Sequence, residues 1–232
     1  MTKKTFFLVF FMLVFARFAS ATTHPGDRQD IPSAKFVSAE FSPEWYVRVI
    51  GGCAYSLGEA DFTDLLSPAA RLSVGYDFSR FIGARLSFGG WQARGRYNYP
   101  NLDYRWNYIL SSAEIVLDIT SIFGSVEQNR LVSLNLFAGG GAAAGFRNIE
   151  AARMRRNSDS FYGFAKLWTG TKAFWGAIGG LEVDFRLARC LSLCLESDAM
   201  MFPDDFNSKV GKDDAFDWQF NCLVGLKFSF GR

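Results

Sequence analysis

The sequence predicts an all-β fold, a transmembrane eight-stranded antiparallel up-and-down β-barrel. Eight segments alternate apolar and polar residues with the period of two that marks a β-strand, and their apolar face carries no charged residue. The 232 residues are 49% hydrophobic and 17% aromatic, with a formal net charge of +2, which suits a single domain. This balance favours neither a disordered acidic chain nor a basic chain that binds nucleic acid.

The N-terminal residues have the pattern of a secretory signal peptide. Two lysines precede an apolar run, and Ala19-Ser20-Ala21 fits the small-residue cleavage rule, so we expect residues 1–21 to be removed. A membrane helix is the alternative, but it needs about 20 apolar residues and Arg17 interrupts this run. Residues 22–44 are polar and lack periodicity, which predicts an N-terminal segment before a barrel over residues 45–230.

Each strand is predicted from the residues on its apolar face. The first four strands, 45–56, 68–78, 82–94 and 105–120, carry Trp45, Val47, Val49; Leu72, Val74, Tyr76, Phe78; Ile82, Ala84, Leu86, Phe88; Ile109, Ala113, Ile115, Leu117 and Ile119. The last four, 131–146, 173–187, 190–200 and 216–230, carry Val132, Leu134, Leu136, Ala138; Trp175, Ala177, Leu181, Val183, Phe185; Leu191, Leu193, Leu195; and Phe216, Trp218, Phe220, Cys222, Val224, Leu226, Phe228 and Phe230. An Arg or Lys facing lipid at mid-membrane costs about 2–4 kcal/mol, which explains the absence of charge.

The links between the predicted strands alternate in length. Residues 79–81 and 188–189 form tight turns, 147–172 is a long link, and 95–104 and 121–130 are of medium length. With an even number of strands, the shorter turns fall mostly on the side of the termini. Two aromatic girdles are expected at the lipid interfaces. One contains Trp45, Phe78, Phe81, Phe185, Phe228 and Phe230, and the other contains Tyr55, Trp175, Phe216 and Trp218.

The opposite face of the strands is polar and carries charges of both signs. Small residues separate these charges, and Lys227 is the only lysine on this face. Charges buried in a narrow interior persist only if they are paired and hydrogen-bonded. We therefore expect a charge network across the lumen, formed by Arg48, Arg71, Arg85, Glu114, Asp118, Glu182, Asp184, Arg186, Glu196 and Asp198.

A secreted, lipocalin-like barrel with an apolar core is the structural alternative. The interior of an eight-stranded barrel is only wide enough for side chains to fill, and Phe, Trp and Tyr from nearly every strand would overfill it. We therefore expect the bulky side chains to face lipid and the charged ones to close the lumen.

The C-terminal residues Gly225-x-x-Phe228-x-Phe230 resemble the signal that outer-membrane proteins present to the barrel assembly machinery. With the segments GARLSFGGWQARG, GGLEVDFRL and PDDFNSK…DWQFNCLVGL, they resemble the OmpA-like, porin-like family of eight-stranded outer-membrane β-barrels. The resemblance implies an integral protein of the cell outer membrane, in contact with lipid and lipopolysaccharide, whose residues 22–44 are periplasmic. Many such proteins continue into a peptidoglycan-binding domain. This sequence ends at the last strand, so we expect no such anchoring.

The sequence offers little for catalysis, and we expect no enzyme. Some eight-stranded outer-membrane barrels modify lipid A with histidine-containing sites, but the single histidine, His24, precedes the predicted barrel. Glu182 and Asp184 could form an acid–base pair, but at this spacing on one strand they fit the charge network better. Cys53 and Cys222 would be neighbours if the first and last strands pair, which leaves a disulfide open. We expect no metal and no cofactor.

Two functional hypotheses follow. Arg153, Arg155 and Arg156 in the long link would contact lipopolysaccharide phosphates, with a merely solvated loop as the alternative. The leading interpretation is a structural outer-membrane barrel whose surface loops contact lipid, adhesion targets or partners, with no nucleic acid and with an unidentified surface ligand. The alternative is a narrow porin-like channel for ions or small solutes. Pairing of the lumen charges separates the two, because paired charges block the bore.

Overall fold

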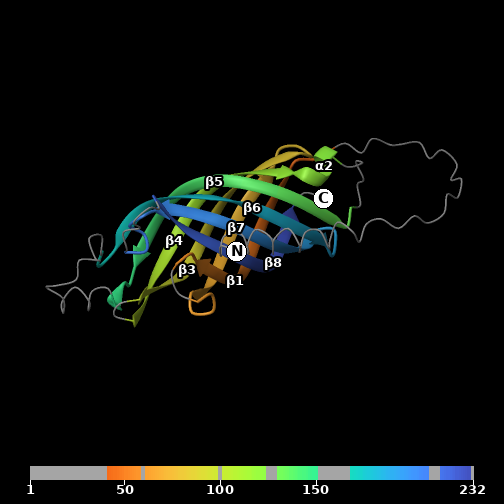
Figure 1. The fold of residues 1–232 in the computed structure, drawn as a ribbon. Helices are drawn as coiled ribbons and strands as arrows, with labels where there is room; N and C mark the ends of the chain where they lie inside the picture. The colour runs from red at the N-terminus through yellow and green to blue at the C-terminus, as the bar shows by residue number, and fades with distance from the viewer. Residues whose placement is uncertain are drawn as a thin grey trace, which may run out of the picture. The chain divides into compact units, whose positions relative to one another are not determined.

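The computed structural model describes residues 41–58, 61–98, 101–123, 130–150, 168–208 and 215–230. Within these residues, eight antiparallel strands pair in chain order and close into a barrel, which confirms the predicted fold class (Figure 1). The strands are β1 (Glu44–Ser56), β2 (Leu66–Asp77), β3 (Ile82–Asn98), β4 (Asn101–Asp118), β5 (Val132–Phe146), β6 (Lys172–Arg186), β7 (Leu191–Pro203) and β8 (Phe216–Phe230). The predicted signal peptide, residues 1–21, and most of the predicted periplasmic segment lie outside the described residues.

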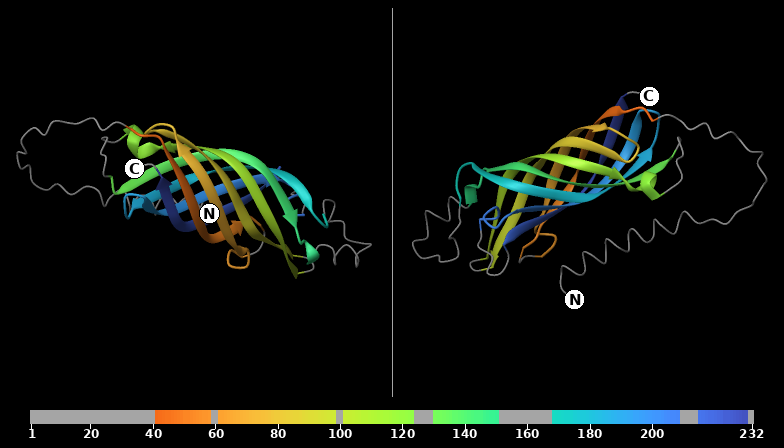
Figure 2. Two further views of the ribbon diagram at one scale, coloured as in Figure 1. Left: turned by 180° about the vertical axis from the view of Figure 1, so that it is seen from behind. Right: turned by 90° about the horizontal axis from the view of Figure 1, so that it is seen from above.

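The first and last strands close the barrel. Trp45 to Ser56 of β1 pair with Phe230 to Gln219 of β8 in one continuous antiparallel register. The strands cross the barrel obliquely (Figure 2), and each described strand is paired on both sides. Lipid cannot hydrogen-bond a free strand edge, so a sheet that spans a membrane has to close in this way.

The bulky face of the strands points outward, as predicted. Val49, Leu86, Ile115 and Val224, each from a different strand, expose between 50% and 57% of their surface. Soluble monomers rarely expose contiguous apolar patches larger than about a few hundred Å², whereas here the exposed apolar residues come from all eight strands. This distribution fits a barrel that sits in hydrocarbon. None of the helices in the described residues is long and apolar enough to cross a bilayer.

Exposed aromatic residues gather near both ends of the barrel. Trp45, Phe78, Phe81, Phe228 and Phe230 lie at the end where β1 begins, and Trp175, Phe216, Trp218 and Trp91 lie toward the other. Tyr55 departs from the prediction, because it is only 6% exposed and its ring centroid lies 4.9 Å from that of Phe62. Its ring is covered by another aromatic side chain instead of facing outward.

The β3–β4 hairpin is longer than predicted. The expected link over residues 95–104 is instead a continuation of the ladder as far as Asn98↔Asn101. At the opposite end, β4 stops at Asp118, and α2 (Ile119–Phe123) replaces the end of the predicted strand. The Asp118 carboxylate accepts hydrogen bonds from the backbone N–H (2.9 Å) and the hydroxyl (2.6 Å) of Ser121, as the N-cap residue of a helix does.

An irregularity in β3 turns one tryptophan outward. Gly90 and Trp91 have positive φ angles of 136° and 152°. Trp91 is 56% exposed, although its register partner Tyr108 is fully buried. A Cβ atom at position 90 would overlap the carbonyl oxygen of Tyr108, so glycine is required there. Beyond this point the alternation resumes, with Ala93 buried and Arg94 exposed.

Candidate functional site

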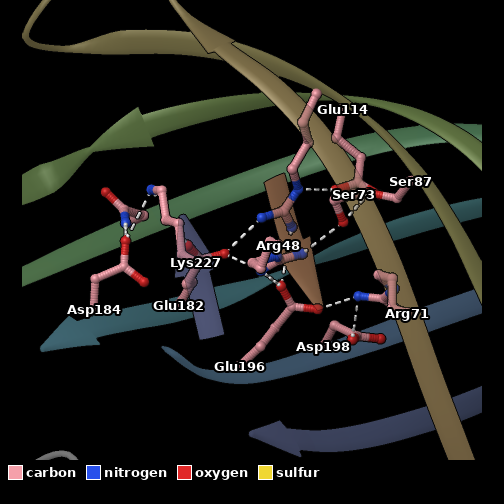
Figure 3. Close-up of polar contacts among 12 residues, drawn as sticks. Arg48, Arg71, Ser73, Ser87, Glu114, Glu182, Asp184, Glu196, Asp198 and Lys227 are labelled. Atoms are coloured by element: carbon pink, nitrogen blue, oxygen red, sulfur yellow. Dashed lines mark hydrogen bonds and ion pairs between the residues drawn. The ribbon is translucent and has the colours of Figure 1, made fainter. Parts of the chain in front are cut away.

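The lumen-facing side chains form a charged layer and an aromatic layer. The charged layer lies toward the barrel end that holds the start of β1, and the aromatic layer lies toward the β3–β4 turn. Alternate residues of a strand face the same side, which turns these side chains into the lumen. The charged layer contains residues from seven of the strands. Arg85 belongs to this layer together with the charged residues that Figure 3 labels: Arg48, Arg71, Glu114, Glu182, Asp184, Glu196, Asp198 and Lys227.

Arg48 of β1 crosses the lumen to reach the far side of the barrel. Its Nη1 group forms ion pairs with Glu182 of β6 and with Glu196 of β7. Its Nη2 group donates to Ser73 Oγ at 3.2 Å, and the Ser73 and Ser87 hydroxyls lie 2.9 Å apart. Arg48, Glu182 and Glu196 are each at most 1% exposed, so these charges are shielded from solvent.

Arg85 of β3 binds three carboxylates at once. Its Nε group pairs with Glu114, its Nη1 group donates to Glu182 at 2.5 Å, and its Nη2 group donates to Glu196 at 3.1 Å. The guanidinium carbon lies 4.1 Å from the ring centroid of Phe137, which covers one face of the group. The second Glu114 oxygen accepts from the Ser112 hydroxyl at 2.6 Å.

Arg71 of β2 extends the network toward the aromatic layer. Its Nη1 group pairs with Glu196 and, at 2.9 Å, with Asp198. The other Asp198 oxygen accepts from the Asn221 amide at 2.6 Å. A Cβ atom at Gly89 would lie 3.0 Å from Arg71 Nε, so the glycine leaves room for this side chain. Glu196 thus accepts from all three arginines.

Lys227 of β8 joins the network at its other edge. Its ammonium group lies 3.0 Å from Asp184 and 3.9 Å from Glu182, and it stands 4.3 Å from the ring centroid of Tyr46. Asn135 donates to the same Asp184 oxygen at 3.2 Å. In the described residues, four cations of this layer therefore face five carboxylates: Arg48, Arg71, Arg85 and Lys227 against Glu114, Glu182, Asp184, Glu196 and Asp198.

Asp118 and Arg186, both expected in the network, are the last residues of their strands. Asp118 caps α2 and lies 3.5 Å from Arg130, because the strand turns into a helix before its side chain can enter the lumen. Arg186 is the last residue of β6 and is half exposed at the barrel end, where its backbone N–H donates to the carbonyl oxygen of Leu131 at 2.8 Å.

The aromatic layer was not expected from the sequence. It contains Tyr104, Trp106, Tyr108, Trp168, Phe174, Phe202 and Phe206, all at most 7% exposed. The Phe202 and Phe206 rings stack at 4.0 Å between centroids, and Trp106 and Tyr108 meet Phe206 edge-on at 5.5 and 5.4 Å. The expectation that aromatic bulk belongs outside is therefore wrong for this end of the lumen.

Glycines make the room that these rings need. A Cβ atom at Gly176 would lie 2.8 Å from Phe202, and one at Gly145 would lie 2.8 Å from Trp168. A sequence signal for the layer did exist in β4, where Tyr104, Trp106, Tyr108 and Leu110 alternate with the polar residues Asp103, Arg105 and Asn107, so that the apolar residues change to the face opposite Ile109. The two layers together place buried side chains in the lumen at two levels.

One group of potential metal ligands lies in the same region. Glu182, Asp184 and Cys194 bring three ligand-type atoms within 4.8 Å of one another, but Lys227 already neutralises Asp184 there. We therefore interpret the trio as part of the ion network. Cys53 and Cys222 are direct register partners on the outer face, and both thiols are free in the structure.

The remaining predicted residues lie on β8 or outside the described chain. Phe228 and Phe230 are exposed on the outer face of β8, and a Cβ atom at Gly225 would overlap the carbonyl oxygen of Val49. Arg153, Arg155 and Arg156 lie outside the described residues.

Comparison with known proteins gives relatives among outer-membrane proteins. No protein-family model matches the chain. Outer membrane protein 40 of Porphyromonas gingivalis (strain ATCC BAA-308 / W83) is 27% identical over 199 residues, which cover 82% of this chain and 48% of the relative. The chain thus spans about half the length of the curated relative that it matches.

Several solved structures are similar to the chain. Neisserial surface protein A (NspA) has 15% identity and a TM-score of 0.46 over 82% of this chain and 100% of its own. OprG from Pseudomonas aeruginosa has 11% identity and a TM-score of 0.48 over 82% and 97%. Ail of Yersinia pestis, in complex with the heparin analogue sucrose octasulfate, has 14% identity and a TM-score of 0.42 over 81% and 97%. The chain has the closed eight-stranded barrel of the family that its sequence resembles.

Proposed function

We propose that this chain is an integral barrel of the bacterial outer membrane with a structural role, and that its surface loops meet lipid, adhesion targets or partner proteins. The outward apolar face supports the membrane location, because exposed Val49, Leu86 and Val224 are stable against hydrocarbon but not against water. The relative named as an outer membrane protein supports the same location.

The buried ion network is the observation that carries the structural role. Arg48, Arg71 and Arg85 start from three consecutive strands and converge on Glu196 at the opposite wall. An ion crossing the lumen would have to displace paired charges that are buried at 3% exposure or less. Beyond them lies the aromatic layer, whose closely packed rings occupy the lumen at a second level. This arrangement favours a closed barrel over a narrow channel.

Single-channel recording of the refolded chain in planar bilayers tests this proposal. We expect no conductance steps from the wild-type chain, and none from Arg85→Glu or Glu182→Arg, because each reversal still leaves the aromatic layer in place. Regular conductance steps from the wild type, altered in size by either reversal, would instead establish the channel function. Heat-modifiable migration in gels shows that each variant has folded before it is recorded.

The partners belong to the same proposal. Gly225, Phe228 and Phe230 would be read by the barrel assembly machinery, and Arg153, Arg155 and Arg156 would contact lipopolysaccharide phosphates. Replacing the three arginines with glutamine should weaken the binding of lipopolysaccharide to the refolded barrel. Unchanged binding would remove this contact from the proposal while leaving the closed barrel intact.

A further inference from the structure

The outward face of the β3–β4 hairpin carries an unusual pair of charges. Beyond Trp91, three cross-strand pairs point away from the lumen: Gln92↔Asn107, Arg94↔Arg105 and Arg96↔Asp103. The first joins two amides, and the third is an ion pair in which Arg96 Nη2 donates to Asp103 at 3.0 Å. In the middle pair, two arginines are register partners across the strands. Like charges directly opposite one another destabilise an antiparallel sheet.

The described neighbours compensate this pair only in part. Glu150 lies 3.7 Å from Arg105 Nε, which is longer than a hydrogen bond, and the Arg105 side chain is 62% exposed. Arg94 Nε donates to Gln92 at 3.4 Å, and the neighbouring carboxylate Asp103 gives both of its oxygens to Arg96. A guanidinium group has five N–H donors, so most donors of the pair face outward and suit an anion that bridges both groups.

The depth of the pair in the membrane indicates what that anion is. Arg94 follows the exposed Trp91 by three residues, and Arg105 precedes the exposed Ile109 by four. At about 3.3 Å per residue and a tilt of about 45°, the pair lies about 7 Å beyond the aromatic girdle. The head groups of the surrounding leaflet occupy that level, and guanidinium groups bind phosphate oxygens bidentately.

We propose that Arg94 and Arg105 form a binding site for the phosphate group of an anionic lipid in the leaflet around the β3–β4 hairpin. The amides of Gln92 and Asn107 stand one register step closer to the girdle and add donors on the lipid side. This site rests on the membrane placement proposed above, and its residues differ from Arg153, Arg155 and Arg156. A lipid phosphate bound by both guanidinium groups would offset the repulsion between Arg94 and Arg105.

The test measures lipid binding to the refolded full chain. Phosphatidic acid, which carries a phosphate monoester, is titrated into the protein in nonionic micelles, and bound lipid is counted by native mass spectrometry. Phosphatidylcholine and inorganic phosphate are the comparison ligands. The variants are the double substitution Arg94→Gln with Arg105→Gln, and the single substitution Arg105→Glu. Arg80→Gln with Arg189→Gln removes two charges at the opposite barrel end and is the matched control.

We expect the wild type to bind phosphatidic acid more tightly than phosphatidylcholine, and the double variant at positions 94 and 105 to lose about tenfold or more of that affinity. The matched control should retain it. Arg105→Glu should also lose phosphatidic acid binding, yet fold as well as the wild type in phosphatidylcholine vesicles, because it makes the cross-strand pair complementary. That combination separates a binding role from a merely structural one.

Three results would overturn the site. The first is equal binding by the wild type and the double variant, and the second is an equal loss in the matched control, which would indicate unspecific charge attraction. The third is displacement of phosphatidic acid by inorganic phosphate at equal concentration, which would indicate a site for the free anion. A wild type that does not insert into phosphatidylcholine vesicles at all would instead refute the membrane placement and this site with it.

Discussion

Replacing Glu196 with glutamine should be the most damaging single change to the charged layer. Glu196 is fully buried and accepts from Arg48, Arg71 and Arg85. Glutamine has nearly the same shape, but it offers one acceptor oxygen and turns an amide donor toward a guanidinium group. Breaking a buried ion pair by removing one partner costs about 3–5 kcal/mol. We expect Glu196→Gln to lower the free energy of unfolding by about that amount.

Glu114→Gln is the informative comparison, because Glu114 serves one arginine and the Ser112 hydroxyl. In that variant Arg85 still pairs with Glu182 and Glu196. The free energy of unfolding should therefore fall by about 1–3 kcal/mol, the value of one buried hydrogen-bonded group. Glu150→Gln, near the exposed Arg105, should cost less than about 1 kcal/mol. Urea titration of protein refolded into vesicles, followed by tryptophan fluorescence and heat-modifiable migration, gives all three values.

The result that would refute this reasoning is an equal effect of the two lumen substitutions. Four cations face five carboxylates in this layer. If net charge and not local pairing set its stability, removing any one carboxylate would neutralise the layer. Glu196→Gln and Glu114→Gln would then both be neutral or stabilising.

Three further predictions concern the outer face, the aromatic layer and the seam. Leu86→Arg, at an exposed position between the girdles, should cost about 2–4 kcal/mol in the unfolding titration in vesicles, and no loss would argue against a lipid-facing position. Phe206→Ala should lower the free energy of unfolding by about 3–5 kcal/mol in the same titration because it leaves a cavity, yet bilayer recordings should stay silent if the barrel is closed as proposed, since the ion network remains in place. Gly225→Ala should reduce the folded fraction seen by gel migration, because its Cβ would overlap the carbonyl oxygen of Val49, whereas Gly51→Ala, with 3.7 Å of clearance from the oxygen of Ala69, should fold normally.

The sequence predicted those parts of the fold that the membrane constrains. Lipid excludes charge from one face of each strand, so residues such as Leu86 and Val224 repeat with period two and fix both strand positions and orientation. The pairing of Arg85 with Glu114 and Glu182 followed from the narrowness of the interior. Lys227 lies on the same polar face, but its pairing with Asp184 and Glu182 was not predicted.

The parts that were missed lie where that constraint ends. Beyond Trp91 the hairpin leaves the apolar band, so Arg96 and Asp103 can stand on an outward strand face without penalty, and their polarity predicts a link over residues 95–104. Trp106 and Tyr108 alternate with Arg105 and Asn107, whereas the apolar face of the rest of the strand follows Ile109, and periodicity alone cannot say which face is inside. The alternation through Ile119 predicts a strand at Asp118, whereas its carboxylate accepts hydrogen bonds from Ser121 and caps a helix.

The seam between β1 and β8 also constrains the order of folding. Cys53 and Cys222, which face each other across it, are separated by 169 positions in the chain. Contacts between such distant residues form late and slowly, because the entropy cost of ordering the intervening segment comes before their pairing can stabilise the structure. A half-inserted intermediate would meanwhile present two open edges to hydrocarbon. Concerted insertion of all the strands, or a catalyst that shelters both edges until they meet, is therefore the favoured route to the folded state.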